Sequence, residues 1–251
     1  MQTRLIVPAM AALAIVALPS AGAVQKETET VARTMRLPAD GTLSLKNFSG
    51  EVRITATGGD SVVIKAVRRA ERPQLDRIKL EIAESGSTIA VNANKRDEGW
   101  TDKNNNVVET EFDIQVPAGA HLDIDVFASP LTITGITGRQ QLKTFSGDIV
   151  VRGARGELNV KSFNGDVELD LSAAGDRPVL EAETFSGEIQ ARFAGNARGR
   201  IEFNSFSGDF ESDVPLQMRS SSRRKTSADL PGGPGGTLQV KTFSGTLHVI
   251  K

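Results

Sequence analysis

The sequence contains no cysteine and no tyrosine, and only one tryptophan and two histidines among its 251 residues. Without cysteine the chain cannot form disulfides, a thiolate zinc site or an iron–sulfur cluster, and it has no cysteine nucleophile. A lipoprotein anchor is excluded too, because that lipid is attached to a cysteine. Two histidines cannot supply a three-histidine metal site. We therefore expect apolar burial and hydrogen bonding alone to hold the fold together.

An excess of one charge is also missing. Thirty Lys and Arg stand against 31 Asp and Glu, which gives a net charge of -1. A balanced chain has no general electrostatic attraction to nucleic acid, so no nucleic-acid partner is expected. The sequence has no Walker-type phosphate loop and no G-x-S-x-G nucleophile elbow. It predicts no catalytic residue, no cofactor and no metal site.

Residues 1–23 have the features of a secretory signal peptide. Arg4 supplies the positive start, and residues 5–18 form an apolar stretch. That stretch is too short for a bilayer, which takes about 20 residues. Ala21-Gly22-Ala23 matches an A-x-A cleavage site. No later apolar run is long enough to span a membrane, so we expect a mature chain exported to the periplasm or cell surface. An uncleaved membrane anchor is the alternative.

A short Phe-Ser-Gly or Phe-Asn-Gly motif recurs six times in the mature chain, usually followed by an acid. Its phenylalanines are Phe48, Phe145, Phe163, Phe185, Phe206 and Phe243, and its glycines are Gly50, Gly147, Gly165, Gly187, Gly208 and Gly245. Ala128-Ser129-Pro130-Leu131 looks like a degenerate copy. From the second copy on, the glycines are separated by 18, 22, 21 and 37 residues. Internal periodicity of this length is typical of a stacked repeat architecture.

Alternating apolar residues flank each motif, such as Leu142 before Phe145 and Ile149 after it. Alternation predicts strands with one buried face, so each repeat should be strand, glycine corner, strand and second turn. Two all-β architectures fit. In a β-solenoid, coils of about 18–22 residues stack with parallel strands about 4.8 Å apart. In an antiparallel meander or sandwich the corners are hairpin turns, for which Asn164-Gly165 is suited. Identical residues in every coil favour the solenoid, because in-register stacking selects them.

One domain is expected over residues 24–251, with a less regular β part at 24–128 and regular repeats at 129–251. A short helical turn is predicted at 73–77, and a hairpin pairs 78–82 with 88–91. Residues 220–236, rich in Ser, Gly, Pro and basic side chains, are predicted to be a mobile loop.

Four sets of side chains are candidates for a function. The motif phenylalanines are interpreted as an internal aromatic ladder that stabilises the core, with a carbohydrate-stacking strip as the alternative. The acids that follow the corner glycines are interpreted as turn residues partly paired with lysines, rather than as calcium ligands. They are Glu51, Asp148, Asp166, Glu188 and Asp209.

The other two sets are surface groups. An acidic group is expected to point outward from two neighbouring strands and is the best candidate for binding a cation or a basic partner; a solvated strand face is the alternative. It consists of Glu109, Glu111, Asp113, His121, Asp123 and Asp125. A basic group, Arg219, Arg223, Arg224 and Lys225, is a weaker candidate for lipid headgroups or anionic glycans.

An exported chain with repeated F-S-G-[DE] corners resembles the bacterial "putative adhesin" β-strand-repeat proteins, a family of unknown function. The resemblance covers about residues 30–251, including the strand–Pro117-Ala118-Gly119–strand passage before the regular repeats. It implies a single-stranded, right-handed β-helix-like solenoid in the cell envelope, and it supplies no catalytic residues. Pro130 in place of a corner glycine and Thr246 in place of an acid depart from the pattern.

These observations predict an exported, non-enzymatic β-solenoid that acts in adhesion or scaffolding by binding an envelope protein or a glycan. One alternative is a carbohydrate-active β-helix enzyme, because β-helices also host lyases and hydrolases. Another is an accessory protein of envelope stress or signalling. Exposed end coils can pair between copies unless they are capped, so a homo-oligomer is also within expectation.

Overall fold

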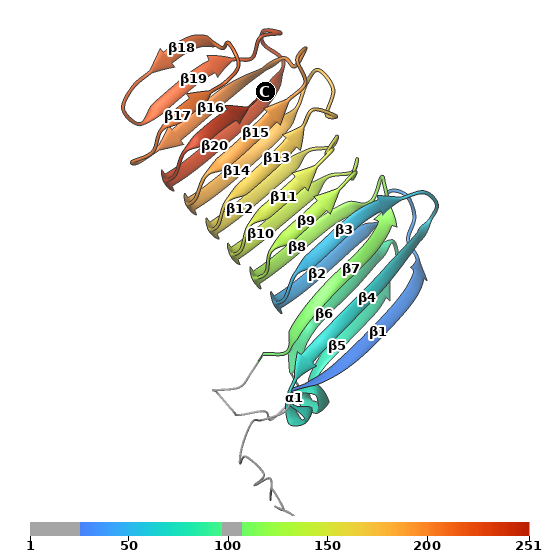
Figure 1. The fold of residues 1–251 in the computed structure, drawn as a ribbon. Helices are drawn as coiled ribbons and strands as arrows, with labels where there is room; N and C mark the ends of the chain where they lie inside the picture. Colours follow the sequence, from blue (N-terminus) through green and yellow to red (C-terminus); the bar gives the residue numbers. More distant parts are fainter. Residues whose placement is uncertain (1–25, 97–106, 251) are drawn as a thin grey trace, which may run out of the picture.

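The computed structural model describes residues 26–96 and 107–250, which form a long stack of β-coils (Figure 1). The predicted signal peptide lies outside these residues. Across 26–96 and 107–250, no helix has the length and apolar character needed to cross a membrane. A short helix, α1 (Arg72–Arg77), begins next to Pro73 and confirms the predicted helical turn.

Two large sheets make the two long sides of the stack. Sheet A contains, in pairing order, β1 (Glu27–Arg36), β4 (Ser61–Ala70), β7 (Glu109–Pro117), β3 (Val52–Thr57), β9 (Leu131–Thr134), β11 (Ile149–Arg152), β13 (Val167–Leu171), β15 (Ile189–Phe193), β21 (Leu247–Ile250) and β17 (Phe210–Ser212). Sheet B contains β18 (Gln217–Ser221), β19 (Lys225–Asp229), β16 (Gly199–Ser205), β20 (Gly236–Ser244), β14 (Val179–Ser186), β12 (Leu158–Asn164), β10 (Gln140–Ser146), β8 (His121–Ala128), β2 (Thr42–Ser49), β6 (Thr88–Arg96) and β5 (Ile78–Ser85).

Each regular coil consists of one strand of sheet B, a glycine corner and one strand of sheet A. Equivalent strands of successive coils pair in parallel: Gln140 of β10 lies opposite Leu122 of β8 and Leu158 of β12. On the other side of the corner, Ile149 of β11 lies opposite Val167 of β13. The prediction of an all-β, solenoid-like fold is therefore confirmed, because a meander would pair these strands antiparallel.

The order of coils in the stack differs from their order in the chain. The coil β20–β21 lies between β14–β15 and β16–β17, although it follows both in sequence. Likewise β2–β3 lies beside β8–β9, with the hairpin β5–β6 inserted between them in the chain. That hairpin confirms the predicted pairing of 78–82 with 88–91.

The interior between the sheets is filled by the inward residues of every strand. Leu142, Ile149 and Val151 are fully buried, as the alternation predicts. They belong to one cluster of buried apolar residues that runs through the coils from Leu37 to Val249. Burial of each such side chain stabilises the fold by about 1.5–3 kcal/mol.

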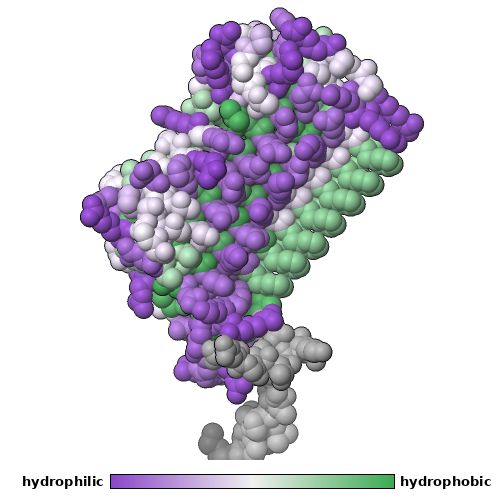
Figure 2. Space-filling model, turned by 180° about the vertical axis from the view of Figure 1, so that it is seen from behind, coloured by the Kyte–Doolittle hydropathy of each residue, from purple (hydrophilic) through white to green (hydrophobic). Residues whose placement is uncertain are grey.

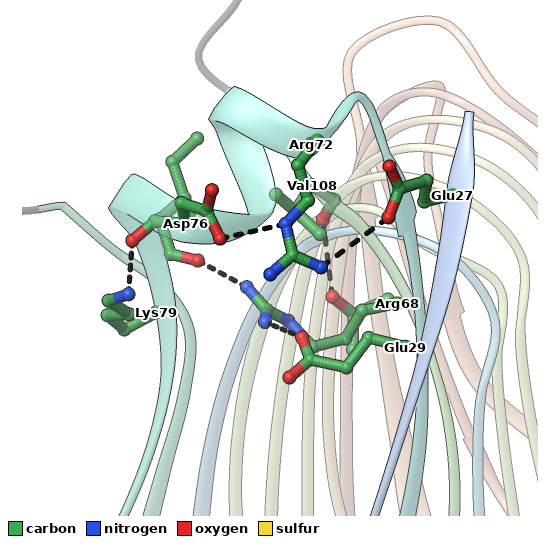
Figure 3. A network of polar contacts seen from close by, with 9 residues as sticks. Glu27, Glu29, Arg68, Arg72, Asp76, Lys79 and Val108 are labelled. Carbon is green, nitrogen blue, oxygen red and sulfur yellow. Dashed lines mark hydrogen bonds and ion pairs between the residues drawn. The ribbon is translucent and has the colours of Figure 1, made fainter. Parts of the chain in front are cut away.

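Antiparallel strands close the first end of the stack, where β1 pairs with β4 and β4 with β7. Figure 3 shows the polar network that ties these strands to α1. Arg68 of β4, almost fully buried, donates to the Glu29 carboxylate of β1 and to the Ile78 carbonyl. Arg72 of α1 pairs with Asp76 at 3.1 Å. The network pairs the charge of Arg68, which would be costly to bury alone.

The prediction of a mobile loop at 220–236 is wrong for most of that segment. β18 and β19 form an antiparallel hairpin, and β19 pairs with β16 at the far end of sheet B. Asp229, whose side chain is fully buried, is held by Arg200 at 3.2 Å and by Arg219 at 2.5 Å. The ion pair of Arg219 with Asp229 therefore joins the two strands of the hairpin.

Candidate docking surface along the phenylalanine ladder

Seven phenylalanine rings stack in a single file along one corner of the coils. Neighbouring ring centroids are 4.6–4.9 Å apart and the ring planes are within 16° of parallel. In stack order the rings are Phe48, Phe127, Phe145, Phe163, Phe185, Phe243 and Phe206. We call this row the ladder. The sequence motif does not include Phe127, although this residue directly precedes the degenerate copy at Ala128-Ser129-Pro130.

The ladder lies on the outside of the protein, so the prediction that it forms part of the core is wrong. Its side chains are 37–52% exposed, and Figure 2 shows them as a continuous apolar stripe along the stack. Strand alternation is the reason. In β10, Leu142 and Thr144 point inward, so Lys143 and Phe145 must point outward.

Polar side chains take the inward position just before six of the seven ladder rings, and Val126 takes it before Phe127. Thr184 donates to the Ser186 carbonyl at 3.1 Å, and Thr242 donates to the Gly245 carbonyl at 3.0 Å. Asn47 donates to the Ser49 carbonyl at 3.1 Å. These bonds give three corner carbonyls a side-chain donor. The buried hydroxyls of Thr144 and Ser162 have no partner within the described parts of the chain, so this bonding does not extend to every corner.

The corner glycines are required by backbone shape and by close stacking. Gly147, Gly165 and Gly187 have φ of 134°, 137° and 129°, a region that other residues rarely adopt. A Cβ on Gly165 would lie 2.5 Å from the carbonyl oxygen of Gly147 in the next coil. Successive corners are therefore in direct backbone contact, which keeps the ladder rings in register.

The acids that follow the corner glycines bind backbone across coils. Asp148 Oδ1 accepts a hydrogen bond from the Asp166 amide at 3.0 Å, and Asp166 Oδ1 accepts one from the Glu188 amide at 2.9 Å. Asp148 and Asp166 thus act in turn chemistry, as interpreted from the sequence. The expected pairing with flanking lysines is not seen among the described residues, because Lys161 and Lys241 pair with Glu183 instead. The corner acids also leave a row of negative charge on one side of the ladder.

Parallel stacking hides the ring faces and exposes only their edges. Each inner ring is covered on both faces by its neighbours, and the outer face of Phe206 is covered by the Arg224 guanidinium at 4.6 Å. Sugars and nucleic-acid bases bind aromatic side chains through the ring face. The ladder instead offers apolar ring edges, so the carbohydrate-stacking alternative does not fit this geometry.

A groove runs along the ladder on its sheet B side. Its other wall is the second outward row of the same strands, which we call the lysine row: Lys46, Asp125, Lys143, Lys161, Glu183 and Lys241. The groove has one hollow of about 410 Å³ beside Phe48, Phe127 and Phe145. A second hollow of about 540 Å³ lies beside Phe163, Phe185 and Phe243. Both hollows include Lys143 in their walls, so they adjoin.

Within the lysine row, Glu183 is paired on both sides. Lys161 and Lys241 each lie 2.9 Å from its carboxylate. Their hydrogen bonds and positive charges lower the pKa of Glu183, against the opposing effect of partial burial. Glu183 in turn raises the pKa of Lys241. Both shifts favour the ionised forms of Glu183 and Lys241 at neutral pH.

The predicted acidic group does not assemble. Glu109, Glu111 and Asp113 lie on β7 of sheet A, whereas His121, Asp123 and Asp125 lie on β8 of sheet B. The expectation of two neighbouring strands is wrong because the turn at 117–119 is a corner between the sheets and not a hairpin. Glu111 is paired with Arg69 at 2.6 Å, a contact that lowers the pKa of this carboxylate. Within the part of the chain that the structure describes, no cluster of three or more His, Cys, Asp or Glu could hold a metal ion.

The predicted basic group is mostly engaged within the protein itself. Arg219 binds Asp229, Arg224 covers Phe206, and Lys225 pairs with Glu202 at 3.1 Å. These side chains therefore cap the end of sheet B and of the ladder.

Comparisons with known proteins agree with this fold. A "putative cell adhesion protein" from Clostridium sporogenes superimposes with a TM-score of 0.58 at 11% identity, covering 89% of this chain and 99% of that chain. A "putative adhesin" from Bacteroides fragilis, at 11% identity over 88% and 97% of the two chains, has a TM-score of 0.32. A "Putative lipid binding protein" from Parabacteroides distasonis, at 10% identity over 88% and 97%, has a TM-score of 0.34. The first of these supports a shared fold, whereas the other two scores are too low to carry an argument.

Sequence comparison gives the family. No curated protein matches the chain. Residues 125–249 match a family described as Toastrack DUF4097. This match and the first structural likeness confirm the expected resemblance to an adhesin-named family of unknown function. The regular coils of this chain, with six of the seven ladder rings, are thus similar to the Toastrack DUF4097 family.

Proposed function

We propose that this chain is an exported, non-enzymatic binding protein of the cell envelope, and that it acts in adhesion or scaffolding by docking through the ladder. The observation that carries the proposal is the exposure of seven stacked rings, each 37–52% accessible. At about 200 Å² per ring, they leave a stripe of roughly 600 Å² of apolar surface. Soluble monomers rarely expose a contiguous apolar patch of that size unless it serves an interaction.

The remaining side chains support binding rather than catalysis. Hydrolysis of a glycosidic bond typically uses two carboxylates that converge in a cleft, and elimination likewise needs an acid and a base placed together there. Here the acids are spread one per coil, and those at the corners accept backbone hydrogen bonds. The adhesion name of the Clostridium sporogenes protein agrees with a binding role.

The proposal also includes export of the chain and a right-handed winding of its coils. The charged start, apolar stretch and small-residue exit of residues 1–23 support export. A right-handed winding of the coils is supported by the strong general preference of parallel β crossovers for that hand.

The proposal is tested by comparing envelope association of three forms of the protein. Phe145→Ser/Phe163→Ser removes two central rings, and Val179→Ser removes a similarly exposed apolar side chain of sheet B away from the ladder. We expect wild type and Val179→Ser to sediment with the envelope fraction and the double variant to stay in the supernatant. If all three forms distribute alike, the ladder is not the docking surface.

A further inference from the structure

We infer that the partner that covers the ladder is a second copy of this chain, lying side by side and parallel to the first, with the two-fold axis along the stack. The inference rests on the proposed function, because it takes the ladder as the docking surface. It adds the identity of the partner and the orientation in which it binds.

The position of the groove supports this arrangement. The two hollows of the groove lie on the lysine-row side of the ladder, whereas on the other side the corner residues follow each ring directly, as serine and glycine at five of the seven rings. A two-fold axis parallel to the stack places each ladder against the partner's groove side. Both ladders can then be seated at once, one in each groove. In an antiparallel pair the two grooves lie on the same side of the contact, so only one ladder can be seated.

The charges are compatible with the parallel orientation. The parallel pair brings the lysine row of one copy opposite the corner acids of the other, coil by coil. Three coils provide complementary pairs and one coil, with Glu183 and Glu188, opposes them. The complementary pairs are Lys46 with Glu51, Lys143 with Asp148, and Lys161 with Asp166, each time across the two copies.

An antiparallel pair would instead set lysine row against lysine row. Along the stack the signs of that row are plus, minus, plus, plus, minus, plus, which is the same order in reverse. When only these six levels overlap, like charges meet at every level. When all seven rings overlap with Phe163 at the centre, Asp125 meets Lys241 and Lys143 meets Glu183, so charge alone does not exclude the antiparallel pair. The one-sided groove is therefore the feature that sets the orientation.

Spacing and area agree with a second copy as the occupant. The ring edges repeat every 4.6–4.9 Å over the whole ladder, and another solenoid of the same repeat can meet them without losing register. Two stripes of roughly 600 Å² bury about 1,200 Å², the lower limit of a standard specific interface. The ends of the stack carry antiparallel strands, β1 with β4 and β18 with β19, which separates this side contact from end-to-end pairing.

Sedimentation velocity of the purified chain over a range of concentrations tests the association. We expect a monomer–dimer equilibrium, and Phe163→Ser should raise its dissociation constant about a hundredfold or more, because two central rings are lost per dimer. Val179→Ser should leave the constant unchanged. Circular dichroism melts confirm that both variants are folded. A wild-type chain that stays monomeric at every concentration overturns the inference.

Single cysteines test the orientation, since the natural chain has none. Ser49→Cys places a spin label beside the first ladder ring, and Asn164→Cys places one at the middle. In the parallel dimer both labels give short distances between copies. In an antiparallel dimer the central pair stays close, whereas the Ser49→Cys pair is separated by at least the ladder length of roughly 28 Å; that result refutes the parallel arrangement.

A vesicle arm separates failure of the inference from failure of the proposed function. Wild type and Phe163→Ser are floated with phosphatidylglycerol vesicles. A monomeric chain that floats only when Phe163 is present has a lipid surface as the ladder's occupant, so the proposed function stands and the dimer is wrong. A monomer that neither floats nor depends on Phe163 for envelope association contradicts both.

Discussion

Replacing Gly165 by alanine tests how closely successive corners are stacked. The residue has φ of 137°, and its new Cβ would lie 2.5 Å from the oxygen and 2.8 Å from the carbon of the Gly147 carbonyl. Because these atoms are backbone, they cannot rotate away as a side chain can. The strained φ costs about 1–3 kcal/mol and the overlap about 1–3 kcal/mol more. Reduced freedom of the unfolded chain offsets about 0.4–1 kcal/mol, so we expect a net loss of about 2–5 kcal/mol.

Gly195→Ala is the matched control. Its Cβ would meet no atom within 4 Å, and its φ lies outside the positive region. We expect its free energy of unfolding to stay within about 1 kcal/mol of wild type. The assay is urea unfolding, monitored by circular dichroism. Stacked repeats need not unfold in two states, so the midpoint urea concentrations of the variants are compared only where their m-values agree. Equal midpoints for the two alanine variants would show that the corners are not in contact.

Three other predictions concern the ladder and two ion pairs. Phe163→Ala should lower the free energy of unfolding by about 1–3 kcal/mol, which is the value of two stacked aromatic contacts. A loss of about 5 kcal/mol, measured by urea unfolding, would instead indicate that the ring is part of the core. The hydrogen bond to Asp213 raises the pKa of His248, so this contact stabilises the fold below about pH 6.5 and is lost as pH rises through the raised pKa. His248→Gln should remove that step from the pH dependence of the melting temperature. Arg219, by its hydrogen bond, holds the pKa of Asp229 below its usual range, so the contribution of this carboxylate is present above about pH 4 and disappears as pH falls through the lowered value. Asp229→Asn should lower the melting temperature at pH 7 and narrow its gap to wild type in acid; a constant gap would contradict the pairing.

The repeat favoured the coils over an antiparallel meander, because in-register parallel stacking selects identical corners whereas a meander has no need of them. The side of the sheet on which the rings lie also follows from the alternation of residues along each strand. The hydrophobicity of phenylalanine pointed to the core instead, and that prediction was wrong. Leu142 and Thr144 share the inner face of β10, so Phe145 is necessarily outside. The chemistry of a side chain indicates where it would be stable, whereas the parity of the strand determines where it points.

Non-local pairing could not be read from the sequence. Nothing in residues 236–250 indicates that they pair with β14 rather than only with β16, since every corner has the same motif. Residues 117–119 resemble a hairpin turn as closely as a corner between sheets, which misplaced the acidic group. The partners of the buried Asp229 were also unpredictable, because Arg200 is distant in sequence and Arg219 adjoins a segment of loop-like composition.

The exchanged order of the last coils constrains when this protein can finish folding. A ribosome completes β16–β17 well before β20–β21, yet the later pair must occupy the slot between β14–β15 and the earlier one. Vectorial growth, coil upon coil, can therefore proceed only as far as β15. β16–β17 can therefore pair with its native neighbour only after β20–β21 has been synthesised. A chain that ends before β20 would lack the parallel strands with which β16 and β17 pair in this structure.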